Sequence, residues 1–410
     1  MTDSKIHLIG LSPDLAWLPP AVGAIINTVD ILAGGERLLE LFPDYQGEKV
    51  PLTLPLHDWL EKIEKLRSDG RSIAVLTSGD PGHFGLATAL FKVIDRGKVV
   101  MIPSPTVVQQ AFAKLGVPWA GTEVVSLHGR EGLGDFWGAV YRASHKSGTG
   151  YLAIYTDARN TPEILAKKLL GRGQQHWRMT VFEDLGSPDE RITSWSLFEA
   201  KLRKFSQLNL VVLECQKKGV QISIGMPEEA FIHEAGLITK KEVRVASLAA
   251  LELLPDQTLW DLGAGSGSVS IEACALLHHG AVWAVEKSPL RCEQISANRA
   301  YFGAAQVEIV EDEALAAISH LPPPDRIFIG GGGKDLPAII RLANAKLKTE
   351  GLMVINLVSL GPLGQAVEVM KECGLEVEVT QIQAARSEPL GASLYLKPLN
   401  QVWIIKGRRP

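Results

Sequence analysis

A carboxylate and three closely spaced glycines stand together in LWDLGAGSGSVSIEA (residues 259–273), where Asp261 is followed by Gly263, Gly265 and Gly267. Glycine lets a backbone turn sharply and approach a ligand, and the helix that follows offers unpaired N–H groups. The spacing G-x-G-x-G differs from the G-x-G-x-x-G of dinucleotide sites, and a carboxylate at this point would repel a pyrophosphate. It would attract a ligand with an amino group and a sulfonium charge. These residues therefore favour S-adenosylmethionine over NAD.

A second acid supports this interpretation. Glu286 ends the next apolar run, AVWAVE, where an acid can accept hydrogen bonds from both ribose hydroxyls. The third run ends in Glu311-Asp312-Glu313-Ala314, the usual neighbourhood of an adenine ring. The alternative is a plain glycine turn with incidental surface acids, and the order of acid, glycines and second acid favours the cofactor site.

Two further motifs in this half have two interpretations each. Thr239-x-x-Glu242 is a capping box that opens a helix, and it serves either as a structural cap or as part of a ligand site. Four glycines, 330–333, follow the run RIFI directly. They form either a flexible loop or a space for a wide, flat substrate beyond the carboxyl end of a strand.

In the first half, four segments each combine the end of a strand with a turn. They are LTSGDPGHFG (76–85), IPSPTVVQQAFAKLG (102–116), SLHGREG (126–132) and VFEDLGSPDERI (181–192). Each alone reads as turn chemistry. Because they recur at successive strand ends, we expect them to surround a ligand cleft.

Short apolar runs alternate with helical stretches twice along the chain, which predicts an α/β protein with two domains. The first half contains KIHLIG, VDILAGG, SIAVLTSG, VVMIP, TEVVSL, YLAIYTD, MTVFEDLG and NLVVLE. The second half contains TLWDLG, AVWAVE, QVEIVED, RIFIGG, LMVINLVS, EVEVTQIQ and QVWIIKG, which makes seven strands. The polar segment 216–231 fits neither set and indicates a linker.

Composition excludes several classes of partner. The chain has 410 residues, of which 46% are hydrophobic and 21% charged, with a net charge of −4 and no dense Lys/Arg block for nucleic acid. No apolar run approaches the roughly 20 residues of a membrane span, and Asp3, Pro13 and Asp14 do not fit a secretory signal. The four cysteines form no CxxC pair, so we expect no metal site and a cytoplasmic location.

Residues 225–407 resemble the precorrin-6B carbon-15 methyltransferases (decarboxylating), through ITKKEVR, DLGAGSGSVSIEA, VEK and RIFIGGGG. The resemblance implies a seven-stranded class I (Rossmann-like) methyltransferase domain. It places the S-adenosylmethionine contacts at Thr239, Asp261, Gly263, Ala264, Gly265, Ser266, Gly267, Glu286 and Ala314.

Residues 5–214 resemble the tetrapyrrole methylases, and among these the precorrin carbon-5 methyltransferases, through the four segments quoted above. That family binds S-adenosylmethionine in a cleft between two α/β lobes. The implied cofactor contacts are Asp80, Pro81, Ser104 and Thr106, and His128, Gly129 and Arg130 are implied near the cofactor or the substrate. One departure is the first loop, usually GxGPG, which reads Gly10-Leu11-Ser12-Pro13-Asp14.

The order of the halves resembles the fused precorrin-6Y C5,15-methyltransferases (decarboxylating) of cobalamin biosynthesis. The resemblance implies a bifunctional homo-oligomer with a methylase domain at 1–214, a linker at 215–235 and a second methyltransferase domain at 236–410. It implies two S-adenosylmethionine sites, methylation of carbons 5 and 15, and loss of the ring C acetate carboxyl group. Candidate substrate contacts are His128, Arg130, Arg159, Lys240, Arg244 and Gly331.

The meso carbons of such a substrate are enamine-like nucleophiles, so we assign no catalytic base. Two alternatives remain. The first half could be a tetrapyrrole-binding module that serves a single catalytic half. The chain could also be a nucleic-acid or protein methyltransferase, although IGGGG stands where an NPPY-like motif would be expected.

Overall fold

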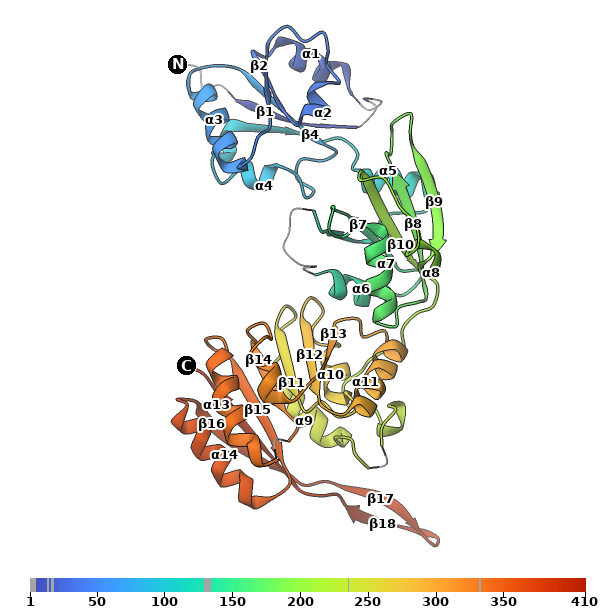
Figure 1. Cartoon of the computed structure of the whole chain (residues 1–410), viewed down its shortest axis with the longest axis vertical. Coiled ribbons are helices and arrows are strands. Elements are labelled where there is room, and N and C mark those ends of the chain that lie inside the picture. The colour runs from blue at the N-terminus through green and yellow to red at the C-terminus, as the bar shows by residue number, and fades with distance from the viewer. Residues whose placement is uncertain are drawn as a thin grey trace.

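The computed structural model describes residues 5–12, 15, 18–128, 133, 135–234, 236–331 and 333–410. Three α/β bodies follow one another along the chain and form an open arc (Figure 1). The first two are the lobes of the N-terminal half, and the third is the C-terminal half. The predicted architecture, a two-lobed domain followed by a seven-stranded domain, is confirmed.

The first lobe is a parallel sheet in the order β3-β2-β4-β1-β5. Its strands are β1 (Ile6–Leu11), β2 (Ile31–Gly34), β3 (Glu48–Pro51), β4 (Ile73–Ser78) and β5 (Val99–Ile102). Its helices are α1 (Pro20–Thr28), α2 (Glu36–Leu39), α3 (Leu56–Ser68), α4 (Ala87–Leu90) and the short η1 (Arg96–Lys98). The apolar residues of β1, β2 and β4 are buried, as expected for strands covered on both faces.

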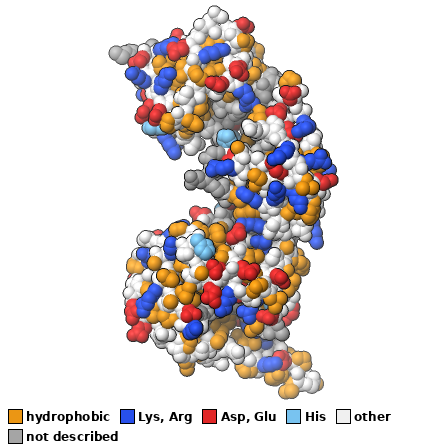
Figure 2. Space-filling model, in the orientation of Figure 1, with side chains coloured by type: hydrophobic (Ala, Val, Ile, Leu, Met, Phe, Trp, Pro, Cys, Tyr) orange, Lys and Arg blue, Asp and Glu red, His pale blue; other side chains and the backbone are white. Residues whose placement is uncertain are grey.

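The second lobe is a mixed sheet in the order β6-β7-β10-β8-β9. Its strands are β6 (Glu123–Ser126), β7 (Tyr151–Tyr155), β8 (Trp177–Glu183), β9 (Arg191–Ser196) and β10 (Asn209–Cys215). Its helices are α5 (Val107–Leu115), α6 (Phe136–Ser144), α7 (Pro162–Gly171) and α8 (Leu197–Ala200). Acidic and basic side chains are interspersed over the face of the molecule seen in Figure 2.

The C-terminal half is built on one sheet in the order β13-β12-β11-β14-β15-β19-β16, with β19 antiparallel to both of its neighbours. Its strands are β11 (Thr258–Leu262), β12 (Ala281–Glu286), β13 (Val307–Glu311), β14 (Arg326–Ile329), β15 (Leu352–Leu357), β16 (Glu376–Ile382) and β19 (Val402–Arg408). A separate hairpin of β17 (Ala385–Leu390) and β18 (Ser393–Pro398) projects from this body (Figure 1).

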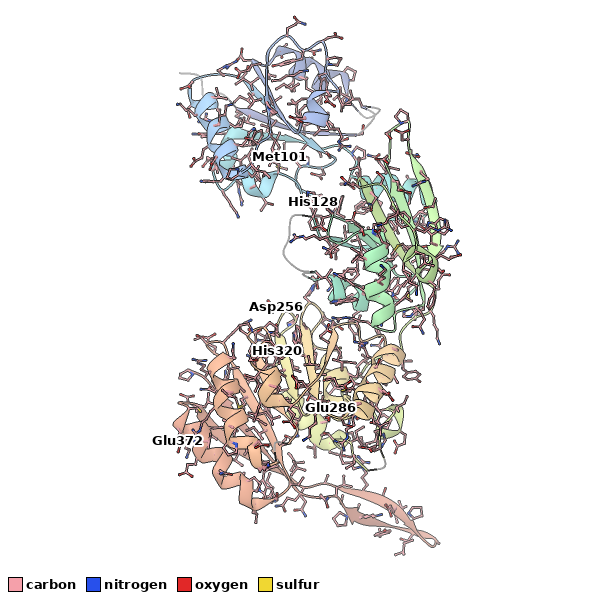
Figure 3. The ribbon with its side chains drawn as sticks, viewed as in Figure 1. Met101, His128, Asp256, Glu286, His320 and Glu372 are labelled. Atoms are coloured by element: carbon pink, nitrogen blue, oxygen red, sulfur yellow. The ribbon has the colours of Figure 1, made fainter. Side chains whose placement is uncertain are left out.

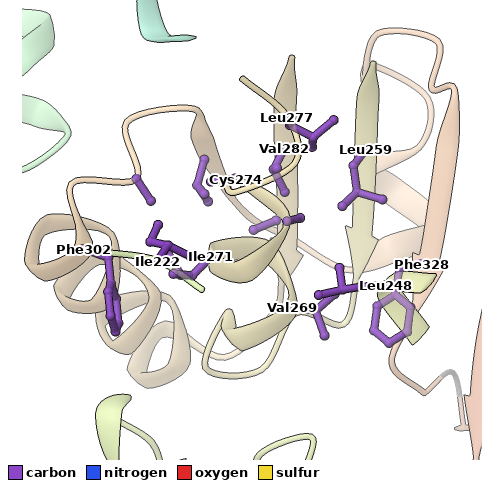
Figure 4. Packing of buried hydrophobic residues seen from close by; sticks show 14 of the residues in the cluster. Ile222, Leu248, Leu259, Val269, Ile271, Cys274, Leu277, Val282, Phe302 and Phe328 are labelled. Carbon is purple, nitrogen blue, oxygen red and sulfur yellow. The ribbon is translucent and has the colours of Figure 1, made fainter. Parts of the chain in front are cut away.

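Helices cover the C-terminal sheet. They are α9 (Lys241–Leu251), α10 (Ser268–Ala273), α11 (Pro289–Phe302), α12 (Ala314–Ala317), α13 (Leu336–Lys346) and α14 (Leu360–Glu372), with short η2 (Glu228–Ala230) and η3 (Gly333–Asp335). Leu248 of α9 and Val269 of α10 pack with Leu259, Val282 and Phe328 of the sheet in one buried cluster (Figure 4). This packing fixes the start of α10, where the glycine-rich loop ends. Among the described helices, none is long and apolar enough to cross a membrane.

The segment predicted as a linker, 215–235, packs largely against the C-terminal half. Ile222, Met226 and Phe231 are buried in the same cluster as α9 and α10. The backbone N–H groups of Gly225 and Met226 donate hydrogen bonds of 2.9 and 2.8 Å to the Glu272 carboxylate. Most of this segment therefore belongs to the C-terminal body.

The predicted capping box at Thr239 is wrong. The N-cap of α9 is Lys240, and no side chain of that residue caps the helix. Glu228 replaces the expected cap, because its carboxylate accepts a hydrogen bond of 2.8 Å from the Lys241 N–H. Glu242 instead forms an ion pair with Arg386 of β17 at 2.6 Å.

The N-terminal half docks against the edge of the C-terminal sheet where the parallel strands begin. Arg142 of α6 donates to the carbonyl of His278, which precedes β12, at 2.6 Å. Arg172 pairs with Glu308, near the start of β13, and Arg299 donates to the carbonyl of Gly171 at 3.0 Å. The contacts between the halves thus lie at the amino ends of β12 and β13.

Candidate active sites

A cavity of about 760 Å³ opens at the opposite edge of the C-terminal sheet, beyond the carboxyl ends of its parallel strands. Its wall combines the segment before α9, the glycine-rich loop after β11, and the ends of β14 and β15. Residues at the base of the hairpin complete it. Predicted site residues that line it are Thr239, Lys240, Asp261, Gly263, Ala264, Gly265, Ser266 and Gly331.

The glycine-rich loop has the backbone that the sequence indicates. Gly263, Gly265 and Gly267 have φ of 77°, 58° and 76°, in the left-handed region that favours glycine. The N–H groups of Gly263 and Ala264 both donate to the carbonyl of Val285, at 2.9 and 3.0 Å. The loop is therefore fixed against β12 while its other side faces the cavity.

Asp261 supplies an unused acceptor in this cavity. The side chain is buried, and its Oδ2 accepts a short hydrogen bond of 2.5 Å from the Ser270 hydroxyl. Its Oδ1 is also buried and has no hydrogen-bond partner among the described residues. Burial raises the pKa of Asp261 to about 6, against the opposing effect of the Ser270 hydrogen bond. A buried acceptor beside a glycine-lined space fits the amino group of S-adenosylmethionine.

Glu286 has a second task besides the predicted ribose contact. Its Oε2 accepts a hydrogen bond of 2.9 Å from the Gly265 N–H, and its Oε1 accepts one of 3.0 Å from Ser288. The carboxylate therefore holds the glycine-rich loop to the end of β12. Glu286, Gly267 and Ala314 are not among the residues that line the cavity in the described part of the chain.

The prediction that Arg244 holds substrate is wrong. Its side chain is fully buried and pairs with the equally buried Glu272 at 2.7 Å. It also donates to the carbonyls of Thr239, at 2.6 Å, and of Met226. Arg244 thus supports the segment that carries Thr239 from behind, whereas Lys240 reaches the cavity itself.

A second cavity, of about 590 Å³, lies in the N-terminal half between its two lobes. Figure 3 shows His128 in this space. The first lobe contributes the loop after β4 and the start of α4, and the second lobe contributes β6 and the residues on either side of it. The lining residues are Gly82, His83, Phe84, Gly85, Thr88, Thr122, Val124, Ser126 and His128.

The predicted cofactor residues of this half flank the cavity and do not line it in the described chain. Asp80 fixes the turn after β4, because its Oδ1 accepts a hydrogen bond of 2.8 Å from the Gly82 N–H. Thr106 caps α5 in a capping box with Gln109. Ser104 is nearly buried, and its hydroxyl has no partner among the described residues. Pro81, which follows Asp80, is buried.

The comparison with known proteins covers both halves. Residues 5–201 match the Tetrapyrrole (Corrin/Porphyrin) Methylases, and residues 229–407 match the Precorrin methyltransferase domain. The precorrin-6Y C(5,15)-methyltransferase [decarboxylating] of a Sinorhizobium species is 31% identical over 403 residues, 96% of this chain and 94% of its own length. The chain belongs to the precorrin-6Y C5,15-methyltransferase family.

Two more matches each cover less than half of this chain. The cobalt-precorrin-6B C(15)-methyltransferase (decarboxylating) of Salmonella typhimurium is 34% identical over 44% of this chain and 94% of its own length. The crystal structure of a precorrin-6y C5,15-methyltransferase from Geobacter metallireducens is 39% identical, with a TM-score of 0.45, over 46% of this chain and 100% of that one.

In this member of the precorrin-6Y methyltransferase family, the altered first loop keeps glycine where the backbone requires it. A Cβ at Gly10 would lie 1.7 Å from the carbonyl oxygen of Gly79. Ser12 is buried. Pro13, Asp14, Gly129 and Arg130 lie outside the described residues. Arg159 follows β7, outside the cavity wall, and pairs with Asp157 at 3.9 Å.

Several residues that line the two cavities were not predicted from the sequence. Asn356, at the end of β15, donates to the Ser247 hydroxyl at 2.8 Å and lines the C-terminal cavity. Asn356 could have been predicted from the sequence, because it is the polar residue in the apolar run LMVINL. His83 and Phe84 lie in the quoted segment LTSGDPGHFG, but only the cavity singles them out.

Proposed function

We propose that the chain methylates a precorrin at ring carbons 5 and 15 with S-adenosylmethionine and removes the carboxyl group of the ring C acetate. The observation that carries the proposal is the full-length relationship to a precorrin-6Y C(5,15)-methyltransferase [decarboxylating]. The two separate cavities support it, because each half has its own space at the ends of its strands.

The C-terminal cavity is assigned to carbon 15 and the decarboxylation. Bound S-adenosylmethionine supplies an electrophilic methyl group on a positively charged sulfur. Asp261 Oδ1 accepts a hydrogen bond from its amino group, Glu286 fixes the glycine-rich loop against it, and Lys240 pairs with a carboxylate of the tetrapyrrole. These residues orient the reacting carbon and exclude water, the contributions that a transfer to an already nucleophilic carbon needs most.

The cavity between the lobes is assigned to carbon 5, with a second S-adenosylmethionine held near Asp80, Ser104 and Thr106. The buried Ser104 hydroxyl, which has no partner in the described chain, supports a ligand at this point. The altered first loop favours a second candidate, in which the N-terminal half binds tetrapyrrole without methylating it.

Mass spectrometry of the product formed from a reduced, decarboxylatable precorrin separates these two functions. We expect the full chain to add two methyl groups and to release one carbon dioxide. A product with one added methyl group, at carbon 15 only, would leave the N-terminal half as a binding module.

A further inference from the structure

The loop after β4 presents an imidazole to the cavity between the lobes. The loop is closed by hydrogen bonds from the His83 N–H to the carbonyl of Asp80, at 3.0 Å, and from the Ala87 N–H to the carbonyl of Pro81, at 3.3 Å. A Cβ at Gly85 would lie 2.5 Å from the carbonyl oxygen of Pro81, so the loop has no room for a side chain at this position. The backbone that carries His83 is therefore fixed at the cavity wall.

The next residue has a disfavoured backbone. Phe84 has φ of 54°, although it carries a bulky side chain, and the residue is 47% exposed. Such conformations persist where the surrounding structure fixes them, and they cluster at functional sites. Here the conformation brings the Phe84 ring edge-on to the His83 ring, with centroids 4.8 Å apart.

The second lobe completes the surroundings of His83. The Tyr155 hydroxyl, at the end of β7, lies 3.5 Å from His83 Nδ1. The cavity also contains His128, but that side chain is exposed and no hydrogen bond fixes it in the described structure. Of the two histidines, His83 is thus the one whose ring is held by both lobes.

Methylation of a meso carbon that carries hydrogen must release a proton. The ring carbon forms a bond to the methyl carbon while the S–CH₃ bond breaks and its electron pair stays on sulfur. The C–H bond then breaks, its electron pair returns to the conjugated ring, and the proton leaves. We propose that His83 contacts the substrate at carbon 5 and accepts this proton on its ring nitrogen Nε2. The inference rests on the proposed carbon-5 activity of the N-terminal half.

The charge state of His83 suits this task. Burial lowers the pKa of His83 below its ordinary value of 6.5, and the nearby Asp80 opposes this only in part. Burial also raises the pKa of Tyr155 to about 12, so this neighbour stays neutral. In the described structure, the titratable groups around His83 are Asp80, Tyr155 and His128. Because its pKa lies below 6.5, His83 is neutral at neutral pH and can accept a proton.

The test compares His83→Gln with His57→Gln in the full chain. His57 lies on α3, its side chain is 68% exposed, and it pairs with Glu61 on the same helix at 3.2 Å. We expect His83→Gln to lower the rate of carbon-5 methylation by roughly 10²- to 10⁴-fold, the usual contribution of an acid–base group. The acid limb of its pH–rate profile disappears, S-adenosylmethionine binding by calorimetry is unchanged, and carbon 15 is methylated normally. His57→Gln behaves as the wild type.

A His83→Gln variant that methylates carbon 5 at the wild-type rate, or that is slow but keeps the acid limb, overturns the proposal. NMR titration of the wild-type protein gives a readout that does not depend on turnover. The His83 signal, identified by its absence from the variant, should titrate below 6.5. A His83 ring that stays protonated at neutral pH also overturns the proposal, whereas a wild-type chain that never methylates carbon 5 refutes the proposed function instead.

Discussion

Asp261 should make cofactor binding in the C-terminal cavity depend on pH. Burial raises its pKa from 3.8 to about 6, and only the ionised carboxylate attracts an ammonium group. The ionised fraction grows as the pH rises through this value. We therefore expect the dissociation constant for S-adenosylmethionine to fall as the pH rises through about 6 and to level off above it. Calorimetric titration over this range measures the effect.

Asp261→Asn is the control for this pH dependence. The amide keeps the size of the side chain and a partner for Ser270 but carries no charge. The variant should bind more weakly above pH 6 and show no step there. If Asp261→Asn kept the wild-type step, another group would be responsible.

Glu286→Ala should weaken S-adenosylmethionine binding by about 1.5–3 kcal/mol, the range for hydrogen bonds to a charged group. The variant removes the acceptor for Gly265 and Ser288 and any contact with the ribose. Carbon-15 methylation and decarboxylation should decline together while carbon 5 is still methylated, as product analysis by mass spectrometry would measure. Glu293→Ala, at an exposed site on α11, is the matched control. An equal loss at both carbons would argue against separate sites.

Of the residues predicted from the sequence for this site, Asp261, Gly263 and Gly265 line the C-terminal cavity. They could be predicted because a carboxylate followed by closely spaced glycines has a specific use. Arg244 was misassigned because a charged residue in a helical stretch gives no sign that it pairs with a buried Glu272. His83 could not be singled out, because its position depends on how two lobes face each other.

Arg386 joins the base of the hairpin to α9 and to the segment before it. Its guanidinium pairs with Glu228 at 2.8 Å and with Glu242 at 2.6 Å. Glu228 also accepts a hydrogen bond from the Lys241 N–H at the start of α9. Arg386→Gln should cost about 1–3 kcal/mol of stability, because the buried Glu228 loses its partner. Lys397→Gln, which breaks an exposed pair with Glu388 on the same hairpin, should change stability by no more than about 0.5 kcal/mol.

Urea unfolding of Arg386→Gln, Lys397→Gln and the wild type measures these changes in the free energy of unfolding. Arg386 lowers the pKa of Glu228 from 4.5 to about 2. The stabilisation by this pair is therefore present above pH 4.5 and is lost as the pH falls towards about 2. Equal midpoints for Arg386→Gln and wild type above pH 4.5 would mean that the cluster does not hold the hairpin.

At the level of elements, the sequence predicted the strands that helices bury. All fifteen apolar runs became strands, and seven of them form the C-terminal sheet. The missed strands are β3, β9, β17 and β18, whose side chains are mostly exposed. A sequence such as RITSWS carries no buried face, so only its pairing with β8 identifies it as a strand.

In the whole molecule, the C-terminal cavity faces away from the N-terminal half. The N-terminal half docks where β12 and β13 begin, and the cavity lies where the parallel strands end. Figure 3 accordingly shows Asp256, before β11, nearer to the N-terminal half than Glu286, at the end of β12. A tetrapyrrole therefore has no direct path through the sheet from one cavity to the other.

Separate halves should consequently complete the reaction in trans. We expect residues 1–218 and 219–410, expressed apart and mixed, to give the product of the intact chain. The cut leaves Ile222 and Met226 with the core that they belong to. Mass spectrometry after sequential addition of the halves is the measurement, and a doubly methylated product formed only by the uncut chain would indicate direct transfer.

Calorimetric titration of the full chain with S-adenosylmethionine tests most directly whether both halves are methyltransferases. Two cofactor equivalents per chain are expected, and Glu286→Ala should weaken one of them and leave the other unchanged. A single equivalent in the wild type, weakened by Glu286→Ala, would contradict the account, because the N-terminal half would then bind no cofactor and could not methylate carbon 5.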